Sequence, residues 1–238
     1  MKAMIFAAGL GTRFKPFTNN HPKALAVINH KSLLQRNVEY LQQYNITEII
    51  INVHHFSHQI IETIEKNKGW GSHISVSNEQ DGLLETGGGL VKAQHLLKSK
   101  EPFLTINVDI LSNLNINHLV DFYDSHNALV ALAVMDRPTS RYFLFNQQHQ
   151  LCGWRNTKTS EEKIVLSQKH YIQKAYSGIT IFNPSIFSLI RQQGKFSLTE
   201  TYLDLAKTQT IVGYDHSSDI VLDVGNIEAI KMAEKYFQ

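Results

Sequence analysis

A glycine-rich, basic segment near the N-terminus holds the first residues that could do chemistry. The apolar run AMIFA leads into Gly9 and Gly11, and Arg13 and Lys23 follow closely. Glycine lets backbone N–H groups approach a ligand, and the basic side chains can meet negative charge. The segment therefore indicates a loop that binds a polyphosphate. The alternative is a tight strand-to-helix turn whose basic side chains lie in water.

Two better-known glycine loops do not fit this segment. A P-loop requires GxxxxGK[ST], and Phe14 stands where its second glycine belongs. The dinucleotide fingerprint fails at the same position. In addition, the second predicted strand ends in Asn52, Val53 and His54, which offer no carboxylate for a ribose. The loop is therefore neither a P-loop nor a dinucleotide fingerprint.

Two carboxylates far apart in the sequence, Asp109 and Asp223, each follow an apolar run. If both runs are strands of one fold, their ends can bring the carboxylates close enough to share a cation. Mg²⁺ prefers a few carboxylates together with water and phosphate oxygens, so this pair and a nucleotide would make a suitable site. The alternative is that each aspartate caps the helix that follows it.

The elements that must position these residues alternate in type along the first half of the chain. Apolar runs typical of strands occupy residues 3–7, 47–53, 73–78 and 102–109. Helical spacing of apolar residues appears between them, at 34–41, 60–64 and 90–97. This alternation requires parallel strands joined by right-handed crossovers. It predicts an α/β fold with a doubly wound, mostly parallel sheet, helices on both faces and ligands at the carboxyl ends of the strands.

The second half changes its rhythm after the apolar run at 128–135. Shorter strand-like pieces at 142–146, 150–154 and 177–182 predict a small antiparallel addition to the sheet. A helix is predicted over 184–193, followed by a last strand at 219–225 and a helix at 226–237. No repeat or linker marks a boundary. We therefore expect one domain, 1–238, with a nucleotide-binding half (1–110) and a second half (111–238).

The composition limits the cellular locations and the classes of partner that we expect for the chain. Of 238 residues, 42% are hydrophobic and 18% are charged, which is typical of a globular protein. Glycine and charged positions interrupt the N-terminal apolar run, so we expect no signal peptide, no membrane span and a cytoplasmic location. A net charge of +2 without a long basic run argues against binding nucleic acid. The single cysteine, Cys152, is expected to be inert packing.

Five segments in order resemble the motifs of the sugar-1-phosphate nucleotidyltransferases. AAGLGTR followed by PKAL resembles the family's GxGTR loop and its PKPL-type segment. ETGGGL, FLTINVD, YSGITIF and VLDVGN resemble later motifs in the same order, so the similarity spans nearly the whole chain. One departure is Val108, which stands where the family has a small residue and adds bulk beside a predicted metal ligand.

The resemblance implies a reaction and a role for each motif residue. A phosphate oxygen of a sugar-1-phosphate would attack the α-phosphorus of a nucleoside triphosphate and expel pyrophosphate. Arg13 would meet the leaving pyrophosphate and Lys23 the α-phosphate, while Asp109 and Asp223 would hold Mg²⁺. The attacking phosphate is already ionised, so no general base is required and positioning carries most of the rate.

Further site residues are carried over from the motifs or from their place beside them. Residues expected at the nucleotide are Ala8, Gly9, Gly11, Thr12, Arg13, Lys23, Glu79, Gly82 and Asp109. Residues expected at the sugar phosphate are Glu85, Thr86, Gly87, Asn107 and Gly178, with Arg155 and Asn156 added by position only. The segment from Thr86 to Gly89 would also offer N–H groups at a helix N-terminus. Its alternative role is close packing of the helix.

The choice of substrates stays open between named alternatives. Glu79 could accept the two donors on the edge of guanine, whereas uracil suits an amide or backbone group such as Gln80. The wording LETGGG and the chain length most resemble the N-acetylmuramic acid-1-phosphate uridylyltransferases of cell-wall recycling, so UTP is expected. The alternatives are GTP with mannose- or heptose-1-phosphate, CTP with phosphocholine, and a non-catalytic homologue. A monomer or small homo-oligomer is expected.

Overall fold

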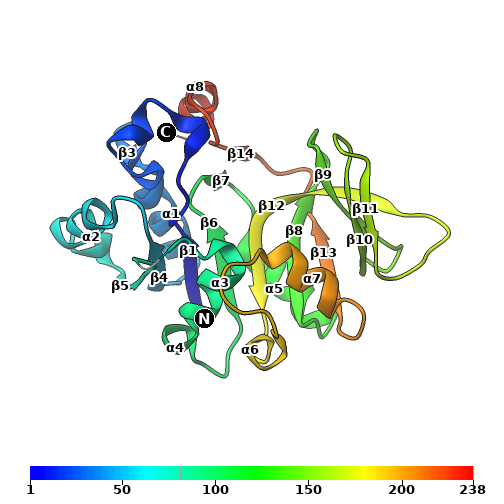
Figure 1. The fold of residues 1–238 in the computed structure, drawn as a ribbon. Coiled ribbons are helices and arrows are strands. Elements are labelled where there is room, and N and C mark those ends of the chain that lie inside the picture. Colours follow the sequence, from blue (N-terminus) through cyan, green and yellow to red (C-terminus); the bar gives the residue numbers. More distant parts are fainter. Residues whose placement is uncertain (81, 238) are drawn as a thin grey trace.

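The computed structural model describes residues 1–80 and 82–237, and its elements alternate as the sequence predicts (Figure 1). The strands are β1 Lys2–Phe6, β2 Val27–Ile28, β3 Lys31–Ser32, β4 Glu48–Val53, β5 His73–Asn78, β6 Phe103–Asn107, β7 Ile110–Ser112, β8 Val130–Met135, β9 Arg141–Phe145, β10 Leu151–Asn156, β11 Glu161–Ile164, β12 Ile172–Phe182, β13 Ile211–Asp215 and β14 Val221–Asp223. The α-helices are α1 Leu33–Gln42, α2 Ser57–Lys66, α3 Glu85–Lys92, α4 Gln94–Leu97, α5 Ile116–Ser125, α6 Ile186–Leu189, α7 Leu198–Leu205 and α8 Ile227–Tyr236. Short 3₁₀ turns include η1 Thr12–Phe14 and η3 Lys23–Leu25.

The first half of the sheet is parallel, and β1 lies at its centre. Strand β1 pairs with β4 on one side and with β6 on the other, and β5 pairs with β4 beyond it. The chain therefore leaves β1 toward β4 and β5 and then returns to the opposite side of β1 to form β6. Ligands of open α/β sheets bind outside the carboxyl ends of the strands at such a reversal. The predicted doubly wound α/β fold is confirmed.

The second half extends the sheet with antiparallel strands, also as predicted. The long strand β12 runs antiparallel to β6, β8 and β9. Strands β9, β10 and β11 form an arm on the right of Figure 1. Strand β13, which pairs parallel to β8, was not predicted. Gly213 interrupts its apolar run, and a Cβ there would lie 2.6 Å from the Phe145 ring, so close packing places a non-apolar residue in the strand.

Two apolar cores lie on opposite faces of the sheet. Because successive side chains of a strand point to opposite faces, Ala3 and Ile5 of β1 pack into one core and Met4 packs into the other. Helices α1, α2, α5 and α8 cover the first face, and α3, α4, α6 and α7 cover the second. In the described part of the chain, no helix is long and apolar enough to cross a membrane.

Further elements of the second half also differ from the sequence prediction. The helix predicted over 184–193 ends at Leu189, because Ile190 adopts extended backbone and the chain then turns to pack Gly194 against α3. The last strand, β14, pairs with β7 in a separate two-stranded sheet instead of joining the main one. Helix α5, whose N-terminus is capped by the Asn115 side chain, was not predicted.

Candidate active site

A cleft of about 430 Å³ opens at the carboxyl ends of β1 and β6, where the chain reverses its direction across the sheet. Its walls come from the loop after β1, the segment after β6, the start of α3 and the segment after β14. The predicted site residues that line it are Ala8, Gly9, Gly11, Thr12, Arg13, Lys23, Glu85, Thr86, Asn107 and Asp109. Segments far apart in the sequence thus meet at one place.

The two glycines of the first loop have different structural roles. Gly11 has a φ of +60°, and a Cβ there would lie 2.9 Å from Thr18 Cγ2. The Thr18 hydroxyl also donates a hydrogen bond of 2.9 Å to Gly11 O. Gly9 needs no such conformation, and a Cβ there would meet no atom within 4 Å. Gly11 is therefore required by the turn, whereas Gly9 leaves open space at the cleft.

Lys23 and Asp109 form an ion pair across the cleft floor. Lys23 Nζ lies 2.5 Å from Asp109 Oδ2, and the two side chains are 9% and 24% exposed. Lys23 belongs to η3, whereas Asp109 follows β6, so the pair joins the loop after β1 to the neighbouring strand end. The ammonium also lies 5.8 Å from the centre of the Phe14 ring. This packing fixes where the positive charge of Lys23 stands.

Asp223 lies beside Asp109 although the two are far apart in the sequence. Asp223 is paired with Ile110 in the β14–β7 ladder, and Val224 N donates a hydrogen bond of 2.8 Å to Asp109 O. Asp223 keeps a solvent-exposed surface, yet partial burial and the Asp109 carboxylate raise the pKa of Asp223 above its ordinary value. The structure thus brings the two predicted metal ligands together.

Arg13 approaches the same carboxylates because Gly225 has no side chain. A Cβ at Gly225 would lie 3.2 Å from both terminal nitrogens of Arg13 and 2.8 Å from Asp223 Oδ1. Val108, the departure from the family pattern, is 6% exposed and belongs to the apolar core beneath the cleft. Val108 therefore belongs to this core and also contributes to the lining of the cleft.

Glu79 is not among the residues that line the cleft. The residue is 0% exposed. Its carboxylate accepts hydrogen bonds from Asn52 Nδ2 at 2.7 Å and from Leu84 N at 3.1 Å. Both oxygens therefore bind the chain's own donors, and the contact of Glu79 with a base stays a prediction that this geometry does not support. Gly82, which follows β5, donates its N–H to Glu79 O and does not line the cleft.

The glycines at the start of α3 serve close packing, which was the alternative to an anion site. Gly87 is buried, and its N–H donates a hydrogen bond of 2.9 Å to Phe196 O. A Cβ at Gly87 would overlap the Phe196 ring, and one at Gly88 would overlap Gly194 O. The Gly87 N–H is therefore occupied by Phe196 O, and its contact with the sugar phosphate stays a prediction that this hydrogen bond does not support. Thr86 and Glu85 do line the cleft.

Arg155 and Asn156 lie on the antiparallel arm and do not line the cleft. Arg155 forms an ion pair of 2.6 Å with Glu162 on the neighbouring strand, and the Asn156 side chain accepts a hydrogen bond from Lys158 N. Both side chains therefore make local contacts, and their place at the sugar phosphate stays a prediction that the cleft lining does not support. Gly178, in contrast, lies against the end of β6, because a Cβ there would be 3.1 Å from Asn107 Nδ2.

Three residues at or near the cleft were missed by the sequence analysis. Asn52 accepts a hydrogen bond of 2.8 Å from Ala7 N and thereby fixes the start of the glycine loop. Arg137 donates to Tyr176 O at 2.9 Å, and its charge opposes the rise in the pKa of Asp223 that burial and Asp109 cause. Gly225 alone had a signal in the sequence, since it follows the apolar run that ends at Asp223. Asn52 and Arg137 stand alone in the sequence without a motif.

Known proteins resemble this chain over most of its length. It is 29% identical over 236 residues to the N-acetylmuramate alpha-1-phosphate uridylyltransferase of Neisseria meningitidis serogroup B, which covers 98% of this chain and 97% of that protein. It is 27% identical over 220 residues to the mannose-1-phosphate guanyltransferase 2 of Candida glabrata, of which it spans 59%.

A solved structure and a family model also match this chain. The crystal structure of HddC from Yersinia pseudotuberculosis complexed with GMP-PN superposes with a TM-score of 0.80 and 21% identity, covering 100% of this chain and 99% of that one. At that identity the likeness concerns the fold. The family model described as nucleotidyl transferase matches residues 2–237, and the chain therefore belongs to the nucleotidyl transferase family.

Proposed function

We propose that this protein is a sugar-1-phosphate nucleotidyltransferase. A sugar phosphate oxygen forms a bond to the α-phosphorus of a nucleoside triphosphate, the bond from that phosphorus to the bridging oxygen breaks, and pyrophosphate leaves. The observation that carries the proposal is that Lys23, Asp109 and Asp223 lie together at the carboxyl ends of β1 and β6, where the order of the strands reverses. Cation and carboxylates at one cleft suit a reaction between two anions.

Arg13 and Lys23 each stabilise the negative charge of a different phosphate group. Arg13, which extends from η1 beside Gly225, meets the leaving pyrophosphate. Lys23 meets the α-phosphate from the cleft floor, and the open space at Gly9 lets phosphates approach the backbone. The attacking phosphate is ionised at neutral pH, so these residues act by positioning and by charge stabilisation, without proton transfer.

Asp109 and Asp223 are the residues that would hold Mg²⁺. Their carboxylate oxygens match the ligand preference of this ion, and Lys23 contacts only one oxygen of Asp109. Among residues 1–80 and 82–237, no cluster of three or more His, Cys, Asp or Glu could hold a metal, so the nucleotide phosphates and water would supply the other ligands. When bound, the ion stabilises negative charge on the phosphates.

The favoured substrates are UTP and N-acetylmuramic acid 1-phosphate, a cell-wall sugar. This choice is supported by the relative from Neisseria meningitidis, which matches along the whole length of both chains. The argument for guanine rested on Glu79, and that carboxylate is occupied by Asn52 and Leu84. On the sugar side, Glu85, Thr86 and Asn107 line the cleft, and Gly178 adjoins Asn107.

The second candidate is a guanylyltransferase acting on mannose-1-phosphate or heptose-1-phosphate. It is favoured by the 27% identity to the mannose-1-phosphate guanyltransferase 2 of Candida glabrata. The chain spans only 59% of that protein, so this relative supports the reaction type more strongly than the sugar.

A pyrophosphate-release assay tests the proposal. UTP, GTP, CTP, ATP and dTTP are each paired with N-acetylmuramic acid, mannose, heptose and glucose 1-phosphates and with phosphocholine, in the presence of Mg²⁺. We expect the fastest release with UTP and N-acetylmuramic acid 1-phosphate. The Asp109→Asn variant should lose this activity, whereas Asp121→Asn, an exposed aspartate of α5, should keep it. No release with any pair would overturn the proposal.

A further inference from the structure

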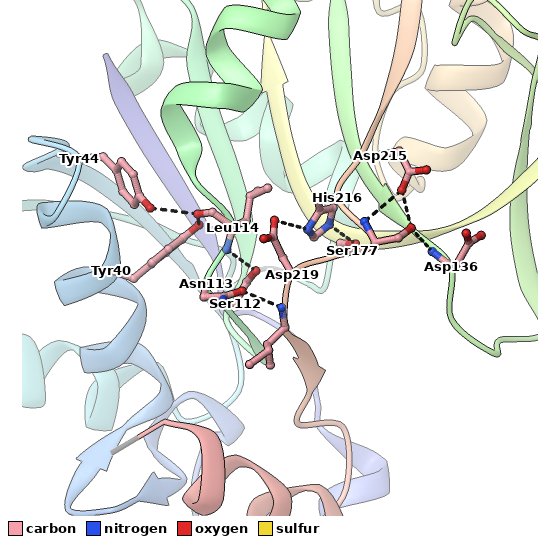
Figure 2. Close-up of polar contacts among 12 residues, drawn as sticks. Tyr40, Tyr44, Ser112, Asn113, Leu114, Asp136, Ser177, Asp215, His216 and Asp219 are labelled. Carbon is pink, nitrogen blue, oxygen red and sulfur yellow. Dashed lines mark hydrogen bonds and ion pairs between the residues drawn. The ribbon is translucent and has the colours of Figure 1, made fainter.

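A buried polar cluster lies beside the cleft, between β12, β13 and the turn that leads to β14 (Figure 2). His216 follows β13 directly, and its side chain is 0% exposed. Its Nε2 lies 2.8 Å from the hydroxyl oxygen of Ser177, which is also fully buried. Its Nδ1 lies 3.4 Å from Asp219 Oδ2. No role in the proposed reaction has so far been given to these three side chains.

The order serine, histidine, aspartate resembles the arrangement that activates a nucleophile. Ser177 is 0% exposed, so no substrate can reach its oxygen, and a role as nucleophile is excluded. The contacts must therefore act on the protein itself. His216 Nδ1 makes no hydrogen bond, but the nearby Asp219 carboxylate favours electrostatically the tautomer that carries its proton on Nδ1, which leaves Nε2 to accept the Ser177 hydroxyl hydrogen.

Ser177 belongs to an irregular part of β12 that reaches the cleft. The register of β12 against β8 shifts between Tyr176 and Thr180, so Ser177 and Gly178 lie in a bulge. Gly178 has a φ of +76°, and a Cβ there would lie 2.7 Å from Ile110 Cγ1 and 3.1 Å from Asn107 Nδ2. The bulge therefore presses Gly178 against the end of β6.

The turn after His216 leads to the second predicted metal ligand. Asp219 N donates a hydrogen bond of 2.9 Å to His216 O. Ile220 N then donates to Asn113 Oδ1 at 2.7 Å, and Asn113 N donates to Ile220 O at 3.2 Å. These bonds align β14 with β7, and β14 ends at Asp223. His216 thus lies between Ser177 of the bulge and Asp219 of the turn that leads to β14, as Figure 2 shows.

We propose that His216, which binds the Ser177 hydroxyl beside the Asp219 carboxylate, is a positioning residue that fixes the Ser177–Gly178 bulge so that the Gly178 backbone and Asn107 meet the sugar phosphate. This inference rests on the proposed function, because it assigns the bulge to the acceptor substrate. It concerns a residue that touches no substrate and acts through the backbone of β12.

Three variants and one matched control test the proposal by kinetics. His216→Leu and Ser177→Ala remove the contact, whereas His216→Gln can present its side-chain oxygen to the Ser177 hydroxyl. We expect the first two to raise KM for the sugar-1-phosphate about tenfold, the size that loss of one buried hydrogen bond gives, with KM for the nucleotide unchanged. His216→Gln should restore most of the loss. Ile64→Ala, in α2 on the other half of the sheet, controls for lower stability alone.

Hydrogen exchange provides a readout that needs no activity. In His216→Leu and Ser177→Ala, the backbone amides of residues 176–180 should exchange faster, and in His216→Gln and Ile64→Ala they should keep the rate of the unmodified protein. The proposal is wrong if these amides are unaffected, or if KM for nucleotide and sugar phosphate rise together. An unmodified protein that turns over no substrate pair overturns the proposed function alone, because the exchange experiment still decides whether His216 holds the bulge.

Discussion

Lys23 and Asp109 are bound to each other across the central strands, with Nζ 2.5 Å from Oδ2. One residue is the cation proposed for the α-phosphate, and the other is a carboxylate proposed for Mg²⁺. Each side chain is oriented by the other, because Lys23 comes from the segment after β1 and Asp109 from the end of β6. The two groups should therefore act in catalysis as one unit.

The first prediction is that the effects of substitutions at Lys23 and Asp109 are not additive. Lys23→Met and Asp109→Asn should each lower kcat by about 10²- to 10³-fold, since each removes charge stabilisation from the phosphates. The double variant should lose little more than either single one. Steady-state kinetics of the four proteins measures the coupling. Multiplicative losses would show that the two groups act independently.

The second prediction separates the two loop glycines. Gly11→Ala should lower the free energy of unfolding by about 1–2 kcal/mol, because alanine is strained at a φ of +60° and its Cβ would approach Thr18. Gly9→Ala should leave stability unchanged and raise KM for the nucleotide, because its Cβ would extend into the open cleft. Urea unfolding and kinetics measure both. Equal nucleotide KM values for Gly9→Ala and the unmodified protein would show that phosphates do not approach this residue.

The third prediction concerns the buried carboxylate of Glu79. In Glu79→Gln, one of the two donors now facing the carboxylate, Asn52 Nδ2 or Leu84 N, would face an amide donor instead. We expect a loss of about 1–3 kcal/mol in the free energy of unfolding, with the ratio of UTP to GTP turnover unchanged. Thermal unfolding and the two turnover rates measure this. A changed ratio would return Glu79 to the role of base reader.

The fourth prediction compares two arginines, of which the sequence analysis assigned Arg13 to the pyrophosphate from its motif and Arg155 to the sugar phosphate by position only. Arg13→Ala should lower kcat strongly, because the guanidinium lies beside Asp223 at the cleft. Arg155→Ala should leave kcat and both KM values unchanged, because its partner is Glu162 on the arm, and an exposed pair of this kind contributes about 0–1 kcal/mol. A raised KM for the sugar phosphate in Arg155→Ala would place the arm at the substrate.

The parallel half of the fold could be predicted because its signals are local. Each strand around β1 is a short apolar run, and each crossover helix repeats its apolar residues at helical spacing, so the order of elements fixes the topology. Asp109 and the glycine loop follow such runs directly, and their place at the strand ends follows from the same argument. Strand β13 was not predicted because Gly213 interrupts its apolar pattern. That glycine is required by close contact with the ring of Phe145, which lies far away in the sequence.

The direction of a side chain could not be predicted in the same way. Three residues show this: Glu79, Gly87 and Arg155. Each was assigned to a substrate from its place in the sequence, but in the fold each binds another part of the chain. A single sequence does not distinguish a glutamate whose carboxylate faces the cleft from one whose carboxylate faces Asn52. The His216 cluster has no motif in the sequence, because Ser177 and His216 are brought together by the bulge in β12.

The last prediction is a pH dependence of stability that comes from His216. Burial lowers the pKa of the His216 imidazole below its ordinary value of about 6.5, although Asp219 and Asp215 act in the opposite direction. As the pH falls, the unfolded chain therefore binds this proton before the folded chain does. The contribution of His216 is complete above about pH 6.5 and is lost as the pH falls toward the lower pKa of the folded state. Urea unfolding of the unmodified protein and of His216→Gln at several pH values between 8 and 5 should give curves that converge on acidification. Parallel curves would show that the imidazole is as easily protonated in the fold as in the unfolded chain.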